Sequence, residues 1–230
     1  RCLHGYEADV DEIVLTASGG PFLGKSRDEL GAVSIGDVLD HPTWRMGRKV
    51  TVDSATLVNK GLEVIEAHWL FGFPYDRISV VVHPQSIVHA LVRLRDGSFI
   101  AHLAPPDMRL PILGAFRYPA IVDFPWKSLA LDEIGRLEFL PVLKEYPAFE
   151  LTLETARAGG TAPAVLNAAD EVAVDAFLRG RIGFLEIVDW LEEALGAHRT
   201  AAVRKIEDVL AADRWTRDFL AARHAGAVTD

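Results

Sequence analysis

The side chains best suited to chemistry lie on one polar stripe of a predicted helix. Apolar residues recur at helical spacing through residues 53–71, DSATLVNKGLEVIEAHWLF, and cover most of the circumference. Asp53 or Ser54 is the predicted N-cap, and Gly72 is the predicted stop. The polar stripe consists of Thr56, Asn59, Lys60 and Glu63. Burying an unpaired charge is costly, so an ammonium and a carboxylate on such a helix must either pair with each other or face a solvent-filled cleft.

The simplest interpretation of Lys60 and Glu63 is an i,i+3 ion pair on a solvated face, which contributes little stability. Two features favour a cleft that binds an anion. Ser54 is predicted at the helix N-terminus, where free N–H groups and the helix dipole favour a phosphate. Residues 41–60 also carry four basic side chains against Asp53 alone, in a chain of net charge −9. The four are Arg45, Arg48, Lys49 and Lys60. We therefore predict an anionic ligand at this helix.

A second candidate anion site is the turn Ser18-Gly19-Gly20. Residues 12–16 predict a short strand that runs into this turn. Small residues after a strand let a phosphate oxygen approach the backbone N–H groups closely. Glycine turns after strands are mostly structural, so this signal is weak by itself.

The elements that must position these residues predict a mixture of helix and strand. Residues 78–82 have the composition of a buried strand. Residues 86–94 and 98–104 flank Asp96-Gly97, which is a strong hairpin signal.

The chain changes character towards its C-terminus. Residues 23–47 are polar and lack sustained periodicity, as is typical of functional or disordered loops. Four prolines within residues 117–147 predict a linker. Helical stretches then follow at residues 148–158, 162–179, 183–196 and 203–223, and their short connections predict an antiparallel bundle. We expect an α/β catalytic domain with a mixed sheet over 1–116, a linker over 117–147 and an all-α C-terminal helical bundle over 148–230.

Composition and charge exclude several classes of protein. A net charge of −9 argues against a general nucleic-acid binder. No apolar run reaches the roughly 18 to 20 residues that span a bilayer, so no membrane partner is expected. The first residues are polar and acidic, unlike a signal peptide. Cys2 is the single cysteine and cannot form an intrachain disulfide, which favours a cytoplasmic location.

Five segments resemble the 1-deoxy-D-xylulose 5-phosphate reductoisomerase family in the family's order and spacing. They are LTASGGPF, HPTWRMGRKVTVDSATLVNKGLEVIEAHWLFG, HPQSIVHALVRLRDGS, PPDMRLPI and LNAADEVAVDAFL. The resemblance runs essentially end to end and is densest from Leu15 to Ile112. The block from His41 to Gly72 is too long and too specific for chance similarity.

The resemblance implies binding of a sugar phosphate, mostly around its phosphate group. The implied substrate residues are Ser18, His41, Trp44, Ser54, Asn59, Lys60 and Glu63. Glu63 is implied to be a ligand of Mg²⁺ or Mn²⁺ and, with His41 and Lys60, to take part in catalysis. Gly47 is implied to contact NADPH. The segment between the glycine turn and Gly47 is implied to be a mobile flap, with Trp44 packing on the substrate.

The reaction implied by the resemblance belongs to non-mevalonate isoprenoid biosynthesis. 1-Deoxyxylulose 5-phosphate would be rearranged and then reduced by hydride from NADPH to 2-C-methylerythritol 4-phosphate. A carboxylate suits a hard cation, and such a cation can stabilise enediolate-like charge. A closed flap would exclude water from the reactive intermediate. The resemblance also implies a homodimer, with the sheet region as its interface.

The chain departs from the family at its start. It has neither a Gly-x-x-Gly-x-x-Gly dinucleotide fingerprint after an N-terminal strand nor the Asp-Ser-Glu segment that supplies two metal ligands in the family. We therefore expect these 230 residues to be one portion of a longer protein and to be inactive in isolation.

Other classes of function are open on the sequence. The main alternative is a non-catalytic sugar-phosphate-binding or regulatory remnant, and a fingerprint with Asp-Ser-Glu encoded upstream would favour the enzyme. A helical assembly module gives no reason for Asn59, Lys60 and Glu63 to line a buried helix. A metal hydrolase lacks HExxH or a comparable ligand pair.

Several polar residues outside the stripe are expected to be structural. His83 is expected to make a structural hydrogen bond, and His89 and His102 are expected to be packed or exposed rather than bound to metal. Asn167, Asp170 and Glu171 are interpreted as helix-end or interhelix contacts.

Overall fold

The structure is a computed structural model that describes residues 1–142 and 146–228. The chain divides into two compact units. The first consists of Arg1–Ser18 and Phe71–Val142, and the second of Gly19–Leu70 and the described part of Leu143–Asp230. None of the described helices combines the length and the apolar character needed to cross a membrane.

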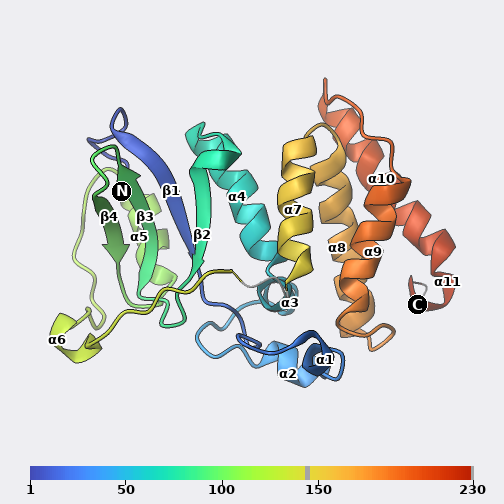
Figure 1. Cartoon of the computed structure of the whole chain (residues 1–230), viewed down its shortest axis with the longest axis horizontal. Coiled ribbons are helices and arrows are strands. Elements are labelled where there is room, and N and C mark those ends of the chain that lie inside the picture. Colours follow the sequence, from blue (N-terminus) through green and yellow to red (C-terminus); the bar gives the residue numbers. More distant parts are fainter. Residues whose placement is uncertain (143–145, 229–230) are drawn as a thin grey trace. The chain divides into compact units, whose positions relative to one another are not determined.

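The first unit is built on a four-stranded mixed sheet (Figure 1). The strands are β1 Val10–Ala17, β2 Ile78–Val82, β3 Val88–Leu94 and β4 Phe99–Leu103, in the order β2-β1-β3-β4. β1 pairs with β2 in parallel, while β1 with β3 and β3 with β4 are antiparallel. Gly97 adopts φ 85° in the turn between β3 and β4. The expected mixed sheet and the Asp96-Gly97 hairpin are therefore confirmed.

Shorter elements complete this unit: the 3₁₀ turn η1 Tyr75–Arg77 and the helices α5 Arg109–Arg117 and α6 Leu131–Ile134. The proline-containing segment expected as a linker holds α6, and Leu140 forms a β-bridge with Val82. Residues 143–145 of that segment lie outside the described part of the chain. Its character as a linker stays a prediction.

The histidines of this unit have structural surroundings. His83 is fully buried, its Nδ1 lies 2.7 Å from the carbonyl oxygen of Glu138, and its ring stacks on Phe139. His89 Nε2 lies 3.0 Å from the carbonyl oxygen of Ala104. Among the described residues, no group of three or more His, Cys, Asp or Glu could hold a metal ion. The structural role expected for His83 is confirmed.

The second unit is helical (Figure 1). Its helices are α1 Arg27–Leu30, α2 Ile35–Leu39, α3 Arg48–Thr56, α4 Val58–Phe71, α7 Pro147–Ala158, α8 Ala162–Leu178, α9 Glu186–Ala197, α10 Ile206–Arg223 and α11 Ala225–Val228. α8 lies at the centre, because it contacts α7, α9 and α10. These four helices match the predicted ones to within a few residues, and their antiparallel arrangement stays a prediction.

The core of the second unit combines residues distant in sequence. Phe22, Val38, Val52, Ala55 and Val58 are buried together with apolar side chains of α8 and α9. The contacts therefore place residues 19–70 in one unit with the C-terminal helices, whereas the predicted domain over 1–116 combined them with the sheet. The domain boundaries at 116/117 and 147/148 stay a prediction.

Residues 23–47, which were expected as a loop, contain α1 and α2. Each begins with a capping box, in which Ser26 pairs with Glu29 and Ser34 pairs with Asp37. The two serine N–H groups donate to these carboxylates at 2.8 Å. A serine followed three residues later by an acid is a signal that the sequence does carry.

We expect Gly61→Ala to destabilise the protein by about 1 to 3 kcal/mol. A Cβ on Gly61 of α4 would lie 2.5 Å from Thr152 Cγ2 on α7. Thr152 is fully buried and its hydroxyl donates to the Ala148 carbonyl at 2.7 Å, so turning its side chain away would break this bond inside the core. This clash outweighs the gain of about 1 kcal/mol that alanine normally brings to a helix.

The matched control for this prediction is Gly196→Ala. Gly196 lies in α9, and a Cβ placed on it would have no atom of another described element within 4 Å. Urea denaturation should show unchanged or slightly higher stability for this control. Equal stabilities for the two variants would contradict the close α4–α7 packing.

Candidate functional site

The predicted helix 53–71 is two helices, which corrects the predicted N-cap. α3 ends at Thr56 and α4 begins at Val58, because Leu57 adopts a left-handed conformation with φ 64°. Ser54 lies in the last turn of α3, and Asp53 is also internal, so neither residue caps a helix. The helix N-terminus predicted at Ser54 is therefore wrong, and the part of Ser54 in substrate binding stays a prediction.

The break places other candidate residues at a helix start. Asn59 and Lys60 lie in the first turn of α4, where backbone N–H groups lack partners within the helix and the dipole favours anions. Leu57 is buried, and a β-carbon in this left-handed conformation costs roughly 1 to 2 kcal/mol. Strain of this kind often occurs at functional sites.

Asn59, Lys60 and Glu63 form one cluster. Lys60 Nζ lies 2.5 Å from Glu63 Oε2, and Asn59 Nδ2 donates to Glu63 Oε1 at 2.7 Å. The Lys60 side chain is 12% exposed and that of Glu63 is 37% exposed. The two residues therefore pair with each other, and the carboxylate still reaches solvent. The buried stripe of α4 runs through Val58, Gly61, Val64 and Ala67.

The apolar surface of α4 extends less far than expected. Trp69 and Leu70 are 77% and 73% exposed, so the C-terminal turn of the helix is not buried. The expectation of a helix that is apolar and buried nearly all round is wrong at this end.

The glycine turn lies against α3. A Cβ on Gly20, whose φ is +66°, would lie 2.9 Å from the Ser54 carbonyl oxygen. The backbone at Gly20 can therefore approach Ser54 only because this residue is glycine. Ser18 is the last residue of the first unit, and its part in substrate binding stays a prediction.

His41 and Trp44 form a compact turn before α3. His41 Nδ1 accepts hydrogen bonds from the backbone N–H groups of Thr43 at 3.1 Å and Trp44 at 2.9 Å. Burial lowers the pKa of His41, which favours the neutral ring. With Nδ1 as an acceptor, the neutral ring carries its proton on Nε2 and is a hydrogen-bond donor there.

Gly47 is the N-cap of α3. Apart from its chain neighbours, no atom of the described residues lies within 4 Å of a Cβ placed on Gly47, so these surroundings leave room for a ligand. The carbonyl of Gly47 accepts hydrogen bonds from the Thr51 N–H at 3.0 Å and from the Thr51 hydroxyl at 2.9 Å. These bonds fix Gly47 to the first turn of α3.

Lys49 does not belong to the predicted anion-binding group, which is a second correction. Its ammonium donates to Asp53 Oδ2 at 2.7 Å and to Asp170 Oδ2 on α8. The Asp53 and Asp170 side chains are 3% and 0% exposed. Two buried carboxylates therefore hold Lys49, whereas Arg45 and Arg48 are exposed. The interhelix role expected for Asp170 is confirmed.

Glu171 also makes an interhelix contact. It pairs with Arg217 of α10 and accepts a hydrogen bond from Asn167 at 3.2 Å. Arg217 bonds to Asp213 as well, at 2.9 Å. This network joins α8 and α10 and includes no residue of α4, so its role is structural.

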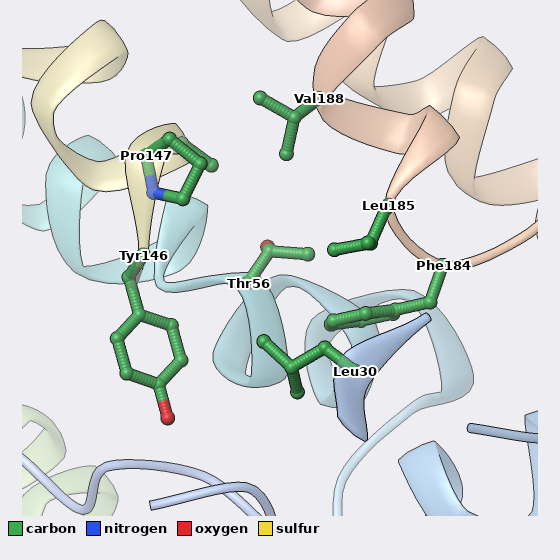
Figure 2. A pocket seen from close by; sticks show the side chains of 8 residues that line it. Leu30, Thr56, Tyr146, Pro147, Phe184, Leu185 and Val188 are labelled. Atoms are coloured by element: carbon green, nitrogen blue, oxygen red, sulfur yellow. The ribbon is translucent and has the colours of Figure 1, made fainter. Parts of the chain in front are cut away.

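A small pocket of the second unit is mainly apolar (Figure 2). Its lining residues are Leu30, Thr56, Tyr146, Pro147, Ala148, Phe184, Leu185 and Val188. The Thr56 hydroxyl donates to the Asp53 carbonyl at 3.1 Å. Without a charged side chain in its lining, this pocket does not suit a sugar phosphate. Thr56 of the predicted polar stripe lines it, whereas Asn59, Lys60 and Glu63 are not among its lining residues.

The candidate metal ligand fits in type but not in number. The Glu63 carboxylate supplies the hard oxygen donors that Mg²⁺ and Mn²⁺ prefer. Among the described residues, Glu63 is not part of any group of three or more His, Cys, Asp or Glu side chains that could hold a metal ion. Glu63 therefore fits one position of a coordination sphere whose other ligands must come from outside this cluster.

We expect the Asp53 cluster to make stability depend on pH. Burial, with a contribution from Asp170, raises the pKa of Asp53 to about 7. The folded protein therefore binds a proton that the unfolded chain releases near pH 4. This contribution to stability is fully present below about pH 4 and is lost as the pH rises through about 7.

The corresponding variant is Asp53→Asn, which removes the titrating group and leaves Lys49 paired with Asp170. The unfolding free energy of the wild type should fall by roughly 2 to 4 kcal/mol between about pH 5 and pH 8, and that of Asp53→Asn should fall much less. Urea denaturation at several pH values measures both slopes. Parallel slopes would show that Asp53 does not titrate in this range.

Comparison with known proteins decides the family. The model described as DXP reductoisomerase C-terminal domain matches residues 103–219, and that described as 1-deoxy-D-xylulose 5-phosphate reductoisomerase C-terminal domain matches residues 1–71. The chain belongs to the 1-deoxy-D-xylulose 5-phosphate reductoisomerase family.

Curated reductoisomerases cover the chain almost completely. The protein from Gloeobacter violaceus is 52% identical over 222 residues, which are 96% of this chain and 57% of that protein. The protein from Acetivibrio thermocellus is 51% identical over 213 residues, or 92% of this chain and 56% of that protein. The chain thus spans somewhat more than half the length of the curated relatives that it matches.

Solved reductoisomerase structures share the fold. The enzyme from Zymomonas mobilis in complex with NADPH superposes with a TM-score of 0.87 at 40% identity, over 96% of this chain and 57% of that one. A reductoisomerase in complex with NADPH, fosmidomycin and magnesium gives 0.88 at 38% identity, with the same coverage. The sheet and helices described above are therefore those of the reductoisomerase family.

Proposed function

We propose that this chain is the C-terminal part of a 1-deoxy-D-xylulose 5-phosphate reductoisomerase that rearranges its substrate and reduces it with NADPH. The observation that carries the proposal is the Asn59–Lys60–Glu63 cluster at the start of α4, in a chain that belongs to this family. The cluster offers an ammonium, an amide and a partly exposed carboxylate within one helical turn.

In this proposal, substrate binding changes the partners of the cluster. Lys60 and Asn59 donate to phosphate or hydroxyl oxygens of the sugar, as charge-assisted donors at a helix N-terminus favour anions. His41 donates from Nε2, and Trp44 packs on the substrate as the flap closes. Ser18 and Ser54 add hydroxyl donors. Glu63, released from Lys60, is free to act as a ligand.

Two cofactors complete the proposal. Glu63 would hold Mg²⁺ or Mn²⁺ together with ligands outside the described cluster, and the cation would stabilise negative charge on the rearranging ketose. Gly47 would contact NADPH, which supplies the hydride. Relatives solved with NADPH and with magnesium support this assignment.

We further propose a homodimer in the cytoplasm that uses the first unit as its interface. Phe99 on the edge strand β4 is 55% exposed, and Ile112 and Phe116 on α5 are 49% and 84% exposed. Contiguous exposed apolar groups are a common feature of association surfaces, and the proposal takes these side chains as part of such a surface.

The test compares the 230-residue chain with the full-length gene product. The full-length protein should consume NADPH only when both 1-deoxyxylulose 5-phosphate and a divalent cation are present, and the isolated chain should not. NADPH absorbance follows the reaction. Sugar-phosphate binding without turnover by the full-length protein would favour the regulatory remnant. Turnover by the isolated chain would refute the proposal that this chain needs the rest of the protein for activity.

A further inference from the structure

The Lys49–Asp53–Asp170 cluster joins the start of α3 to the middle of α8. Lys49 is the second residue of α3 and directly follows the Gly47–Arg48 step. Asp170 is fully buried on α8, and α3 packs against α8. The ammonium of Lys49 is the link, since it bonds to a carboxylate on each helix.

Stability alone does not account for this cluster. Asp53 Oδ1 and Asp170 Oδ1 are both buried without a hydrogen-bond partner among the described residues. Two carboxyl groups share one ammonium, and the raised pKa of Asp53 reflects the cost of burying both of them as anions. Well-packed apolar side chains at such positions are often as stabilising as the charges, or more so. An ionic cluster that is costly to bury can instead fix one geometry among several.

The position of α3, which this cluster fixes, also determines the positions of residues in the proposed ligand site. The Gly47 carbonyl is held by the Thr51 N–H and hydroxyl, so Gly47 moves with the first turn of α3. Ser54 lies in the last turn of the same helix, and Gly20 packs on its carbonyl oxygen. Whatever fixes α3 along α8 therefore fixes the end of the proposed flap as well.

We infer that Asp170 is a positioning residue: acting through Lys49, it sets where α3 begins and thereby holds Gly47 in place for the nicotinamide cofactor. This inference rests on the proposed function, because Gly47 contacts a nicotinamide cofactor only if the full-length protein is the reductoisomerase. Asp170 itself touches neither substrate nor cofactor in this proposal.

The first test is Asp170→Asn in the full-length protein. The amide keeps the shape of the side chain and removes the charge that orients Lys49. KM for NADPH should rise about tenfold, the effect of roughly one charge-assisted hydrogen bond, with kcat changed less than about threefold. The control is Asp175→Asn on the same helix, where an exposed Asp175 pairs with Arg179 at 2.9 Å. It should leave KM and kcat unchanged.

The second test separates positioning from stability. The triple variant Lys49→Met, Asp53→Ala, Asp170→Leu replaces the charges by apolar groups of similar total volume. Its thermal unfolding midpoint should equal or exceed that of the wild type, and KM for NADPH should still rise about tenfold. A normal KM in this stable variant, or in a folded Asp170→Asn protein, overturns the inference.

The activity of the wild-type full-length protein distinguishes a failure of the positioning role of Asp170 from a failure of the proposed function. Wild-type turnover with an unchanged KM in the variants defeats only the positioning role of Asp170. A folded wild-type protein that does not oxidise NADPH in the presence of substrate and metal defeats the proposed function instead.

Discussion

Glu63→Gln is expected to lower the turnover of the full-length protein by about 100-fold or more. The amide keeps the size of the side chain and can still accept from Asn59, but it loses the charge that attracts a hard cation. The metal concentration for half-maximal activity should rise in parallel. Steady-state NADPH oxidation over a magnesium titration measures both effects.

The control for Glu63→Gln is Glu66→Gln, an exposed acid less than one turn further along α4. It removes the same charge from the same helix and should leave turnover and metal dependence unchanged. Both proteins should unfold at similar temperatures, because Glu63 is itself partly exposed. Wild-type turnover with an unshifted metal titration in Glu63→Gln would remove Glu63 from the proposed metal site.

The parts of the fold that the sequence predicts are those decided locally. The β3–β4 hairpin follows from alternating residues around Asp96-Gly97, because a left-handed glycine sets the turn and thus the register. α7 to α10 follow from apolar periodicity and from glycines between them. The polar stripe of α4 also follows, since Asn59, Lys60 and Glu63 need only helical spacing to meet.

The break at Leu57 could not be predicted in this way. Neither glycine nor proline lies at residues 53–60, and leucine disfavours positive φ. The conformation persists because Leu57 and its neighbours Ala55 and Val58 are buried in the packed core. Tertiary packing thus overrides the local preference, and it moves the helix start from Ser54 to Val58.

The role of Lys49 was hidden for a different reason. Asp170 is 121 residues away in sequence, so a count of charges within residues 41–60 misses the carboxylate that neutralises Lys49. Charge counted along the sequence therefore overestimated the positive charge available to an anion. Lys60, in contrast, pairs with Glu63 within the candidate cluster on α4.

Lys60→Met is expected to raise KM for 1-deoxyxylulose 5-phosphate about 10- to 100-fold, with a smaller change in kcat. Methionine keeps the length of the side chain and its apolar stem but cannot donate to a phosphate oxygen. Hydrogen bonds that involve a charged group contribute about 1.5 to 3 kcal/mol, which corresponds to this range. Inorganic phosphate should also inhibit the variant more weakly. Lys127→Met, at a side chain that is 84% exposed, is the control and should change neither constant.

A double variant decides between the two interpretations of the Lys60–Glu63 pair. If Lys60 serves only as the ion-pair partner of Glu63, adding Lys60→Met to Glu63→Gln changes nothing further, because the first substitution has already removed the charge to be paired. If Lys60 binds the substrate phosphate, the double variant should combine the higher KM of one change with the lower kcat of the other. The free energies of the two single changes would then add to within about 0.5 kcal/mol. Adjacent residues that add in this way act on different parts of the substrate, which is what a phosphate donor and a metal ligand on one helical turn must do.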